Sequence, residues 1–271
     1  MSAPPPVVLT IAGSDSSGGA GIEMDLKVLS ALGVFGTCAI TALTAQNTVG
    51  VRAAYETPAE FVRSQIEAVL ADLPVKAAKT GMLSSEVVVR AVVEARGKGS
   101  SPPLVVDPVV VAKDGTHLLS QAGIAAVRDE LLPVSAIATP NISEAEALTG
   151  LRIASEEDVP AAAAKLRDLG CTWVLVKGGH LGGPEVVDLL LGPEGEQAFT
   201  SPRIPGGPFH GTGCALSAAI AAFLAHGRPI PDAVREARSF LQGLIENALA
   251  LGRGALVLHP QQRNSGEGEQ P

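Results

Sequence analysis

The chain has 271 residues, of which 46% are hydrophobic and only 3% aromatic, with a formal net charge of −8 and a pI near 5.2. Such a length buries a substantial core, and an apolar content rich in Ala, Val and Leu suits parallel strands covered by helices better than an antiparallel sandwich. The acidic balance argues against nucleic-acid and anionic-membrane partners, because both select a basic surface. We therefore expect small-molecule partners.

The predicted elements alternate along the chain, beginning with a buried strand over residues 7–12, the glycine-rich turn GSDSSGGAG and a helix over residues 22–32. The further strands are expected at 37–43, 75–79, 104–106, 136–139 and 173–177, and the further helices at 58–70, at 84–95, from about 143 and at 157–169. Strands at 185–191 and 197–204, for which an antiparallel pairing is considered, precede an apolar helix within 209–222. This alternation predicts an α/β fold with a parallel sheet covered on both faces. We expect one domain over residues 1–258 and a disordered polar tail over 259–271.

The cysteines and the first residues indicate the compartment. Cys38, Cys171 and Cys214 have no paired metal-ligand spacing and cannot all pair with one another, which is typical of a reduced cytoplasm. The opening MSAPPPVVLT has no basic leader region, and no uninterrupted apolar run reaches the length of a spanning helix. The five histidines also lack the spacing of a zinc site. We expect a cytoplasmic protein without a membrane partner.

Polar or glycine-rich segments follow five of the predicted strands. They read GSDSSGGAG, KTGM, DPVV, TPN and KGGH. In open α/β sheets, ligands bind beyond the carboxyl ends of the strands, where these segments come together. Each segment by itself fits an ordinary turn, but together they predict a ligand-binding cleft.

The segment FHGTGCALSAAIAA, residues 209–222, places glycines and a cysteine at the start of an apolar helix. Gly211, Thr212 and Gly213 are positioned to offer backbone amides to a phosphate, at the positive end of the helix dipole. Cys214 at the same end is expected to have its thiolate form favoured, which suits a base or nucleophile. The alternative is a glycine turn that merely caps a core helix.

Candidates for the other parts of a phosphoryl-transfer site are also present. Lys177 ends the strand VLVK and is followed by two glycines, so it is positioned either to reach a phosphate or to remain a solvated strand-end lysine. Asn141 and Glu144 in NISE are spaced to place Glu144 near a magnesium ion, although their spacing equally fits a helix cap. No Walker, dinucleotide-binding or GxSxG motif occurs. A thiol hydrolase using His210 and Cys214 is a poor alternative.

In their order along the chain, the motifs resemble those of the hydroxymethylpyrimidine/phosphomethylpyrimidine kinases of thiamine biosynthesis, in the ribokinase-like superfamily. The resemblance runs from residue 8 to about residue 258 and rests on LTIAGSDSSGGAGIEMDLKVLSALGVFGT, ITALTAQNTVGV, KTGML, LVVDPVVVAKDG, TPNISEAEALTG, VLVKGGH and HGTGCALSAAIAA. It implies a ribokinase-like three-layer sandwich with a central, mostly parallel sheet. It also implies ATP-dependent phosphorylation of 4-amino-5-hydroxymethyl-2-methylpyrimidine and then of the monophosphate, with Mg²⁺ and a homodimeric state.

The resemblance also assigns residues to the parts of this site. It places the pyrimidine near Gly13, Ala20, Asp25, Gln46, Met82 and Val109. It places the nucleotide near Asn141, Lys177, Gly211, Thr212 and Gly213, and the metal near Glu144 and Asp107. Cys214 and Lys177 are then the catalytic residues. Gln46 has the right chemistry for an aminopyrimidine edge, because a carboxamide both donates and accepts, while Met82 and Val109 would otherwise be assigned to core packing.

Some positions depart from the family pattern and from the wider superfamily. Sugar kinases of this superfamily usually carry an aspartate where this chain has Cys214, whereas the pyrimidine branch commonly carries the cysteine. Glu23, Met24 and Ala215 stand where Gln, Ala and Thr are usual, and GRGALVLHP replaces the usual C-terminal glycine pattern. These differences concern pocket detail rather than the reaction class.

Two other functions remain open at this point. A pyridoxal or pyridoxine kinase phosphorylates a hydroxymethyl group on a similar ring, and Gln46 is the residue that discriminates it from a pyrimidine kinase. A noncatalytic ligand-binding homologue is the second alternative. The presence of Lys177, Asn141, Glu144 and the GTGC sequence argues against it.

Overall fold

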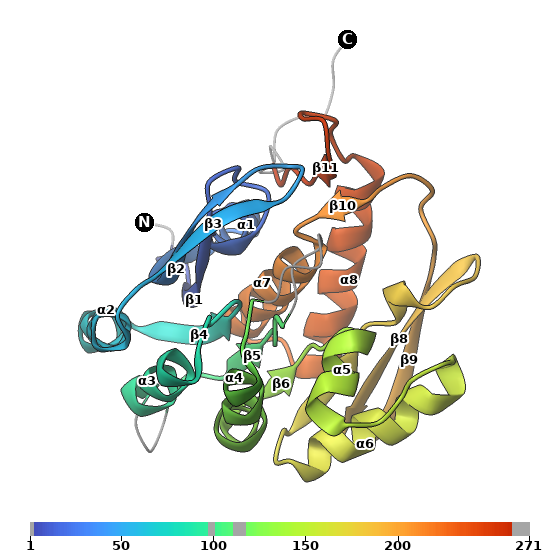
Figure 1. Cartoon of the computed structure of the whole chain (residues 1–271), viewed down its shortest axis with the longest axis horizontal. Helices are drawn as coiled ribbons and strands as arrows, with labels where there is room; N and C mark the ends of the chain where they lie inside the picture. Colours follow the sequence, from blue (N-terminus) through green and yellow to red (C-terminus); the bar gives the residue numbers. More distant parts are fainter. Residues whose placement is uncertain (1–2, 97–100, 111–117, 262–271) are drawn as a thin grey trace.

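The structure is a computed structural model that describes residues 3–96, 101–110 and 118–261. Its main sheet has nine strands with helices on both faces (Figure 1). In sheet order, the strands are β3 (Val51–Glu56), β2 (Phe35–Gln46), β1 (Val7–Asp15), β4 (Val75–Thr80), β5 (Leu104–Val106), β6 (Ile137–Ala138), β7 (Trp173–Val176), β8 (Glu185–Gly192) and β9 (Gly195–Pro202). The short strands β10 (Phe209–His210) and β11 (Leu256–Val257) pair separately.

The central strands, from β2 across to β7, are parallel. Antiparallel pairing occurs only toward the sheet ends, where β3 pairs with β2 and β8 pairs with β7 and β9. The antiparallel pairing considered for residues 185–191 and 197–204 is thus confirmed. Because the central strands are parallel, the segments that follow β1, β4, β5, β6 and β7 all leave from one edge of the sheet.

Helices cover the sheet in two layers, each with its own core. One core joins the sheet to α1 (Gly21–Ala31), α7 (Thr212–Ala225) and α8 (Ile230–Glu246). The other joins it to α2 (Ala59–Asp72), α3 (Glu86–Arg96), α4 (Gln121–Ala126), α5 (Ile142–Thr149) and α6 (Val159–Asp168). The expected three-layer α/β fold is therefore confirmed.

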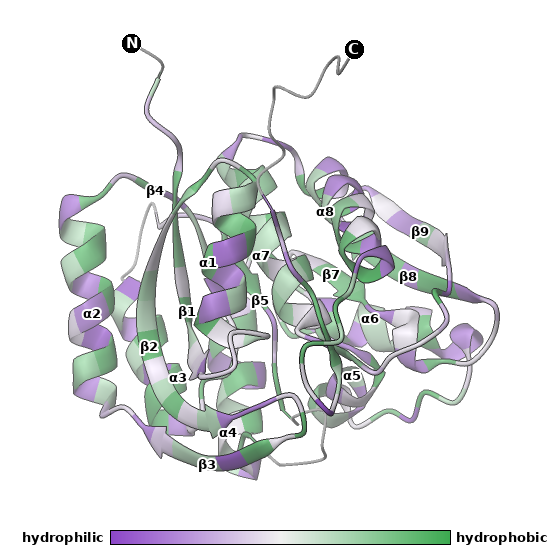
Figure 2. Ribbon diagram, turned by 90° about the horizontal axis from the view of Figure 1, so that it is seen from above, coloured by the Kyte–Doolittle hydropathy of each residue, from purple (hydrophilic) through white to green (hydrophobic). Residues whose placement is uncertain are grey.

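Helix α7, which carries the GTGC sequence at its start, is the most enclosed of these helices. Every residue from Ala215 to Ala222 is buried, and Figure 2 shows α7 as largely hydrophobic, whereas α2 and α8 carry hydrophilic stripes. A helix enclosed on all sides has an apolar surface all round. Its first turn is consequently held in one position relative to the sheet edge.

Several elements are absent from the predicted sequence pattern, namely β3, α4, α8 and the short strands β10 and β11. Five of the six residues of β3 are exposed, so this strand lacks the buried alternation that marks a strand in sequence. Residues 262–271 of the expected tail lie outside the described residues. Within the described part of the chain, no helix is long and apolar enough to cross a membrane.

Candidate active site

The loop before α7 lies directly against the glycine-rich turn after β1. Gly211 has φ +80°, and a Cβ at this position would lie 2.0 Å from the carbonyl oxygen of Gly19. Gly21 has φ +57°, and its added Cβ would lie 2.3 Å from the Gly13 oxygen. Only glycine combines this backbone conformation with so close an approach. The GSDSSGGAG and HGTGC segments, which are far apart in the sequence, therefore form one continuous wall.

This contact predicts that Gly211→Ala is destabilising well beyond the cost of its left-handed backbone. That backbone cost is about 1–3 kcal/mol, and the clash with Gly19 adds to it. The matched control is Gly227→Ala, because Gly227 has φ +82° with nothing within 4 Å of an added Cβ. Chemical denaturation should show a much larger loss of stability for Gly211→Ala. Equal losses for the two variants would show that the two loops are not tightly packed.

A cation and two carboxylates meet in front of this wall. Lys177, which follows β7, places Nζ 2.9 Å from Asp107 Oδ1 and 3.9 Å from Glu144 Oε2. A Cβ at Gly213 would lie 3.3 Å from both Lys177 Nζ and Asp107 Oδ2. The lysine is thus held at the first turn of α7, and these two carboxylates raise its pKa against the opposing effect of burial. It is a fixed cation beside the expected anion site.

Glu144 belongs both to this cluster and to the cap of α5. Asn141 accepts a hydrogen bond from the Glu144 backbone N–H at 2.9 Å, and Glu144 accepts one from the Asn141 N–H at 2.7 Å. These two hydrogen bonds form a capping box, so the helix-cap alternative for Asn141 and Glu144 is present in the structure. The Asn141 side-chain oxygen is used in this cap. Burial raises the pKa of Glu144 to about 7, with Asp107 adding to the shift and Lys177 opposing it.

The carboxylates of Asp107 and Glu144 are the side chains here that could coordinate the metal ion of a metal–nucleotide complex. No group of three or more His, Cys, Asp or Glu side chains suited to a metal occurs among the described residues. Mg²⁺ usually keeps several waters and binds through one or two carboxylates plus substrate phosphates. The two carboxylates therefore fit the number and kind of protein ligands that Mg²⁺ takes when it binds with a nucleotide.

Cys214 lies in the first turn of α7, half-buried, with its sulfur accepting a hydrogen bond from the Gly21 N–H. Burial raises the pKa of its thiol to about 11, despite the opposing effect of the Lys79 cation. The expectation that the helix terminus favours the thiolate is therefore not met in this structure. Loss of hydration is the largest contribution to this shift, and the Asp25 and Asp107 carboxylates add to it.

Asp25, which the resemblance assigns to the pyrimidine, takes part in an internal ion pair in this structure. It is completely buried and accepts hydrogen bonds from Lys79 Nζ at 2.9 and 2.7 Å and from Thr10 at 2.6 Å. Burial by itself would lower the pKa of Lys79, but Asp25, together with Asp107 and Cys214, outweighs burial and raises that pKa. Both oxygens of Asp25 are thus engaged by Lys79, and one of them also by Thr10.

This pair predicts a strong effect on stability. Lys79→Met would leave the Asp25 carboxylate buried without its cation, which typically destabilises a protein by about 3–5 kcal/mol. Adding Asp25→Leu to that variant should recover most of the loss, because two apolar groups then replace the pair. Chemical denaturation measures both changes. A loss below about 1 kcal/mol in the single variant would contradict a charged pair.

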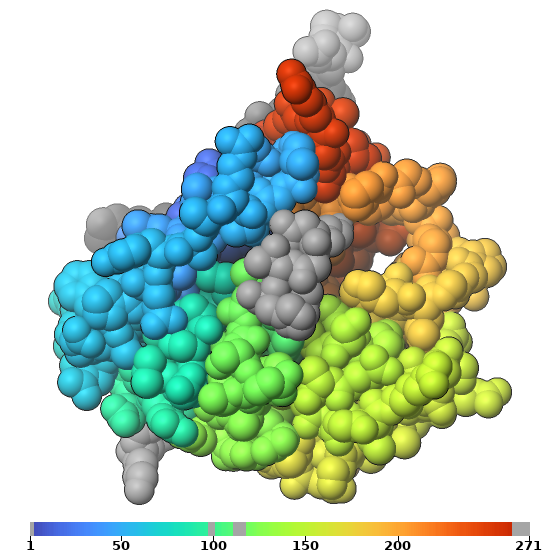
Figure 3. Space-filling view, in the orientation of Figure 1, coloured from blue at the N-terminus to red at the C-terminus, as the bar shows by residue number. Residues whose placement is uncertain are grey.

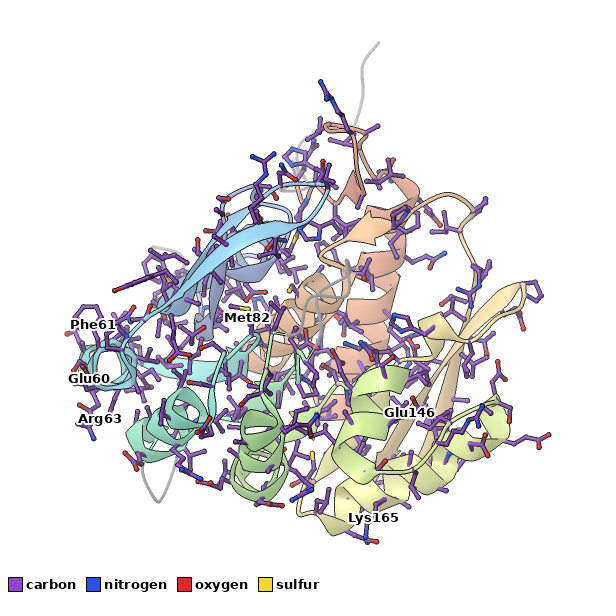
Figure 4. The ribbon with its side chains drawn as sticks, in the orientation of Figure 1. Glu60, Phe61, Arg63, Met82, Glu146 and Lys165 are labelled. Carbon is purple, nitrogen blue, oxygen red and sulfur yellow. The ribbon has the colours of Figure 1, made fainter. Side chains whose placement is uncertain are left out.

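Of the other residues assigned to the pyrimidine, Gly13, Ala20 and Met82 lie at or beside the turn after β1, whereas Val109 follows β5. A Cβ on Gly13 would lie 2.5 Å from the Met82 methyl carbon, so the absent side chain makes room for that methionine. Met82 itself follows β4 near the middle of the molecule (Figure 4). Ala20 precedes α1 and donates its N–H to Asp15 at 2.9 Å. Val109 is half-buried after β5, two residues beyond Asp107.

Asp15 and His210, which the motif analysis did not assign to the site, are bonded to the glycine-rich turn and to Gln46. Asp15 accepts hydrogen bonds from the backbone of Ser17, Gly19 and Ala20. His210 Nε2 lies 2.8 Å from Asp15 Oδ2 and 3.0 Å from Gln46 Nε2. His210 had entered only as a weak partner for Cys214. Its actual partners are 195 and 164 residues away in sequence, so spacing could not reveal them.

The loop after Lys177 is also fastened by residues that the motifs did not identify. Asp188 on β8 accepts from the Gly178 N–H at 2.8 Å and from Arg238 Nε at 2.7 Å. Arg203 donates to the carbonyls of Gly179 and Gly183, at 2.9 and 2.8 Å. In Figure 3 this face is hollowed between the yellow segment around β8 and the orange segment that leads into α7.

Comparison with known proteins identifies the family. Residues 15–259 match the family described as "Phosphomethylpyrimidine kinase". The chain belongs to the phosphomethylpyrimidine kinase family. A hydroxymethylpyrimidine/phosphomethylpyrimidine kinase from Streptomyces coelicolor is 48% identical over 250 residues, which cover 92% of each chain. The resemblance stated from the motifs is thus confirmed, and the family shows the protein to be a phosphotransferase.

Solved structures of two kinases share this family fold. The phosphomethylpyrimidine kinase of Clostridium difficile is 42% identical, with a TM-score of 0.79 over 89% of this chain and 99% of that one. The pyridoxal kinase of Staphylococcus aureus, solved with AMP-PCP and pyridoxal, is 32% identical, with a TM-score of 0.86 over 94% of each chain. The likeness in fold therefore extends to kinases of two ring systems, and the ribokinase-like architecture is confirmed.

Proposed function

We propose that this protein transfers a phosphoryl group from ATP to 4-amino-5-hydroxymethyl-2-methylpyrimidine, and a second one to the resulting monophosphate, in thiamine biosynthesis. The observation that carries the proposal is the position of Lys177. It is held by Asp107 and Glu144 beside Gly213, at the positive end of a helix whose middle is completely buried. Phosphoryl transfer depends mainly on such positioning and on charge stabilisation.

The residues around Lys177 have complementary tasks in this mechanism. The backbone amides of Gly211, Thr212 and Gly213 bind the oxygens of the transferred group, and Lys177 offsets their charge. Asp107 and Glu144 would hold Mg²⁺, which when bound neutralises phosphate charge. The cap at Asn141 keeps Glu144 in place, and Asp188 keeps the Lys177 loop in place.

Cys214 serves the acceptor hydroxyl in this proposal. Its position in the first turn of α7, against Gly21, places the sulfur between the anion-binding amides and the turn assigned to the pyrimidine. An alcohol loses a proton as it attacks, whereas a phosphate monoester is already anionic near neutral pH. The thiol is therefore required for the first transfer and has a lesser part in the second.

The pyrimidine is assigned to the space between the turn after β1, Met82 and Gln46. Met82 supplies an apolar surface, and the Gln46 amide supplies one donor and one acceptor, as the edge of an aminopyrimidine requires. Gly13 and Val109 complete the apolar boundary of this subsite. Asp25 supports the subsite from below through Lys79.

A comparison of acceptors tests the proposal against the pyridoxal alternative. ADP release would be followed with the hydroxymethylpyrimidine, its monophosphate and pyridoxal as acceptors. We expect kcat/KM to be highest for the two pyrimidines. A kcat/KM that is higher for pyridoxal would support the alternative raised by the Staphylococcus aureus neighbour, and ADP release with none of the acceptors would contradict a small-molecule kinase.

We also propose that the enzyme is a cytoplasmic homodimer, and that β2 and β3 supply the contact. Leu43 and Tyr55 are paired across these strands, and their exposed fractions are 51% and 71%. Exposed apolar pairs on an edge strand commonly mark an interface. Light scattering would measure the mass of the wild type and of Tyr55→Arg. We expect the mass of a dimer for the wild type and a lower mass for the variant, and a wild-type mass equal to that of one chain would contradict the homodimer.

A further inference from the structure

The turn after β1 holds the backbone of Gln46, the last residue of β2. The Ser16 hydroxyl donates to the Gln46 carbonyl oxygen at 2.8 Å and accepts from the Gln46 N–H at 2.9 Å. A hydroxyl can make one bond of each kind, so a single side chain satisfies both backbone groups. The amide side chain therefore projects from a backbone that is fixed on both sides.

The Asp15–His210 contact decides which atom of the Gln46 amide faces the imidazole. Hydrogen bonds from His210 and Ser17 hold the pKa of Asp15 below its usual value, against the effect of burial, so this carboxylate only accepts. The Nε2 hydrogen of His210 is consequently directed to Asp15, 2.8 Å away. An imidazole nitrogen that carries a hydrogen has no lone pair for an NH₂ group. The group that fits 3.0 Å from it is the amide oxygen of Gln46, which shares the hydrogen with Asp15.

Thr44 leads independently to the same orientation. Its hydroxyl donates to the Ser14 carbonyl oxygen at 2.9 Å, so toward Gln46 it can only accept. The amide atom placed 3.4 Å from Thr44 Oγ1 is Oε1, which is also an acceptor. Rotating the Gln46 side-chain amide by half a turn exchanges its oxygen and its NH₂ group. The NH₂ group then donates to Thr44, and the oxygen accepts from His210, so both contacts are satisfied. Amide nitrogen and oxygen are assigned from such networks.

We propose that Thr44 and His210 are positioning residues that lock the Gln46 amide in this single orientation, and that Ser16 anchors its backbone. One lone pair of the oxygen and one hydrogen of the NH₂ group then remain for a ligand. They match an amino group beside a ring nitrogen, which is the edge that an aminopyrimidine has and a pyridine alcohol lacks. The inference rests on the proposed function. It states that Thr44 and His210, through the Gln46 amide, make the site prefer an aminopyrimidine to a pyridine alcohol.

A double-mutant cycle on binding tests whether His210 acts through Gln46. Binding of 4-amino-5-hydroxymethyl-2-methylpyrimidine would be measured by calorimetry for the wild type, His210→Phe, Gln46→Ala and the double variant. We expect His210→Phe to weaken binding about tenfold in the wild type, as for loss of one hydrogen bond. In the Gln46→Ala background it should change binding by less than about twofold. Equal effects in the two backgrounds would overturn the inference.

Further variants separate positioning from general structural damage. His210→Gln, whose NH₂ group can replace the ring N–H, should restore most of the affinity, and Thr44→Val should lower it without reducing the side-chain size. For Thr44→Val we expect KM for the pyrimidine to rise while KM for ATP stays unchanged. If His210→Phe does not fold, Thr44→Val with Gln46→Ala provides the cycle, and additivity there would equally overturn the inference. Failure of the wild type to bind the pyrimidine would overturn the proposed function itself, and with it the inference.

Discussion

Lys177→Met is expected to slow both phosphoryl transfers by about 10³-fold, near the upper range for removal of one charge-stabilising group. Two effects combine in this variant. The transferring group loses its cation, and the Asp107 and Glu144 carboxylates, which share Lys177 at 2.9 and 3.9 Å, are left to repel each other and the nucleotide. Rapid-quench measurements with each acceptor would give the two rates. The loss should be similar for the pyrimidine and for its monophosphate.

Lys165→Met is the matched control for this prediction. Lys165 is exposed on α6, at the lower edge of the molecule in Figure 4, so the same exchange there should leave both rates within about twofold of the wild type. Lys177→Arg is not expected to rescue the activity, because a planar guanidinium cannot occupy the position of a compact ammonium group. A loss of less than tenfold in Lys177→Met would contradict the assignment of Lys177 as the stabilising cation.

Cys214→Ala is expected to slow the first transfer by about 10²-fold and the second by much less. General-base assistance is worth about 10²- to 10⁴-fold, and a loose phosphoryl transition state requires little of it. The two acceptors therefore act as internal controls for each other. Equal losses of both rates would show that the thiol positions the acceptor instead of taking its proton.

The pH dependence gives a second measurement on Cys214. Since burial raises the pKa of this thiol to about 11, only a small thiolate fraction exists at pH 7 in the free enzyme. The fraction grows as pH rises, so kcat/KM for the hydroxymethylpyrimidine should increase across pH 7 to 9.5. In Cys214→Ala this increase should be absent. A flat profile in the wild type would contradict proton removal by Cys214.

The sheet and the place of the site could be predicted from sequence because both depend on local signals. Alternating apolar runs mark the central strands, and the polar segments after them meet at one edge by the geometry of a parallel sheet. Lys177, Gly213 and Glu144 were accordingly expected together, and the structure brings them together. The glycines that we propose for the anion site could also be named from sequence, because their residue type and their position before an apolar helix carry the information.

The contacts that were not predicted join residues with no local signature. Lys79 and Asp25 are 54 residues apart, and nothing in the strand VKAAKT distinguishes a buried ion pair from a solvated lysine. The partners of His210, Asp15 and Gln46, are likewise 195 and 164 residues away, so its sequence neighbours do not indicate them. The pKa of Cys214 was misjudged because a helix end can be recognised in sequence, whereas the burial that opposes its effect cannot.

The central claim, that one site carries out two successive phosphorylations of an aminopyrimidine, is tested most directly by phosphorus NMR of the products. The wild-type protein would be incubated with Mg·ATP and 4-amino-5-hydroxymethyl-2-methylpyrimidine, and the spectrum followed over time. We predict a monoester signal that rises first and is then replaced by the signals of a pyrimidine diphosphate. A spectrum in which ATP is consumed without either pyrimidine product, or in which pyridoxal alone becomes phosphorylated in a parallel sample, would contradict the account.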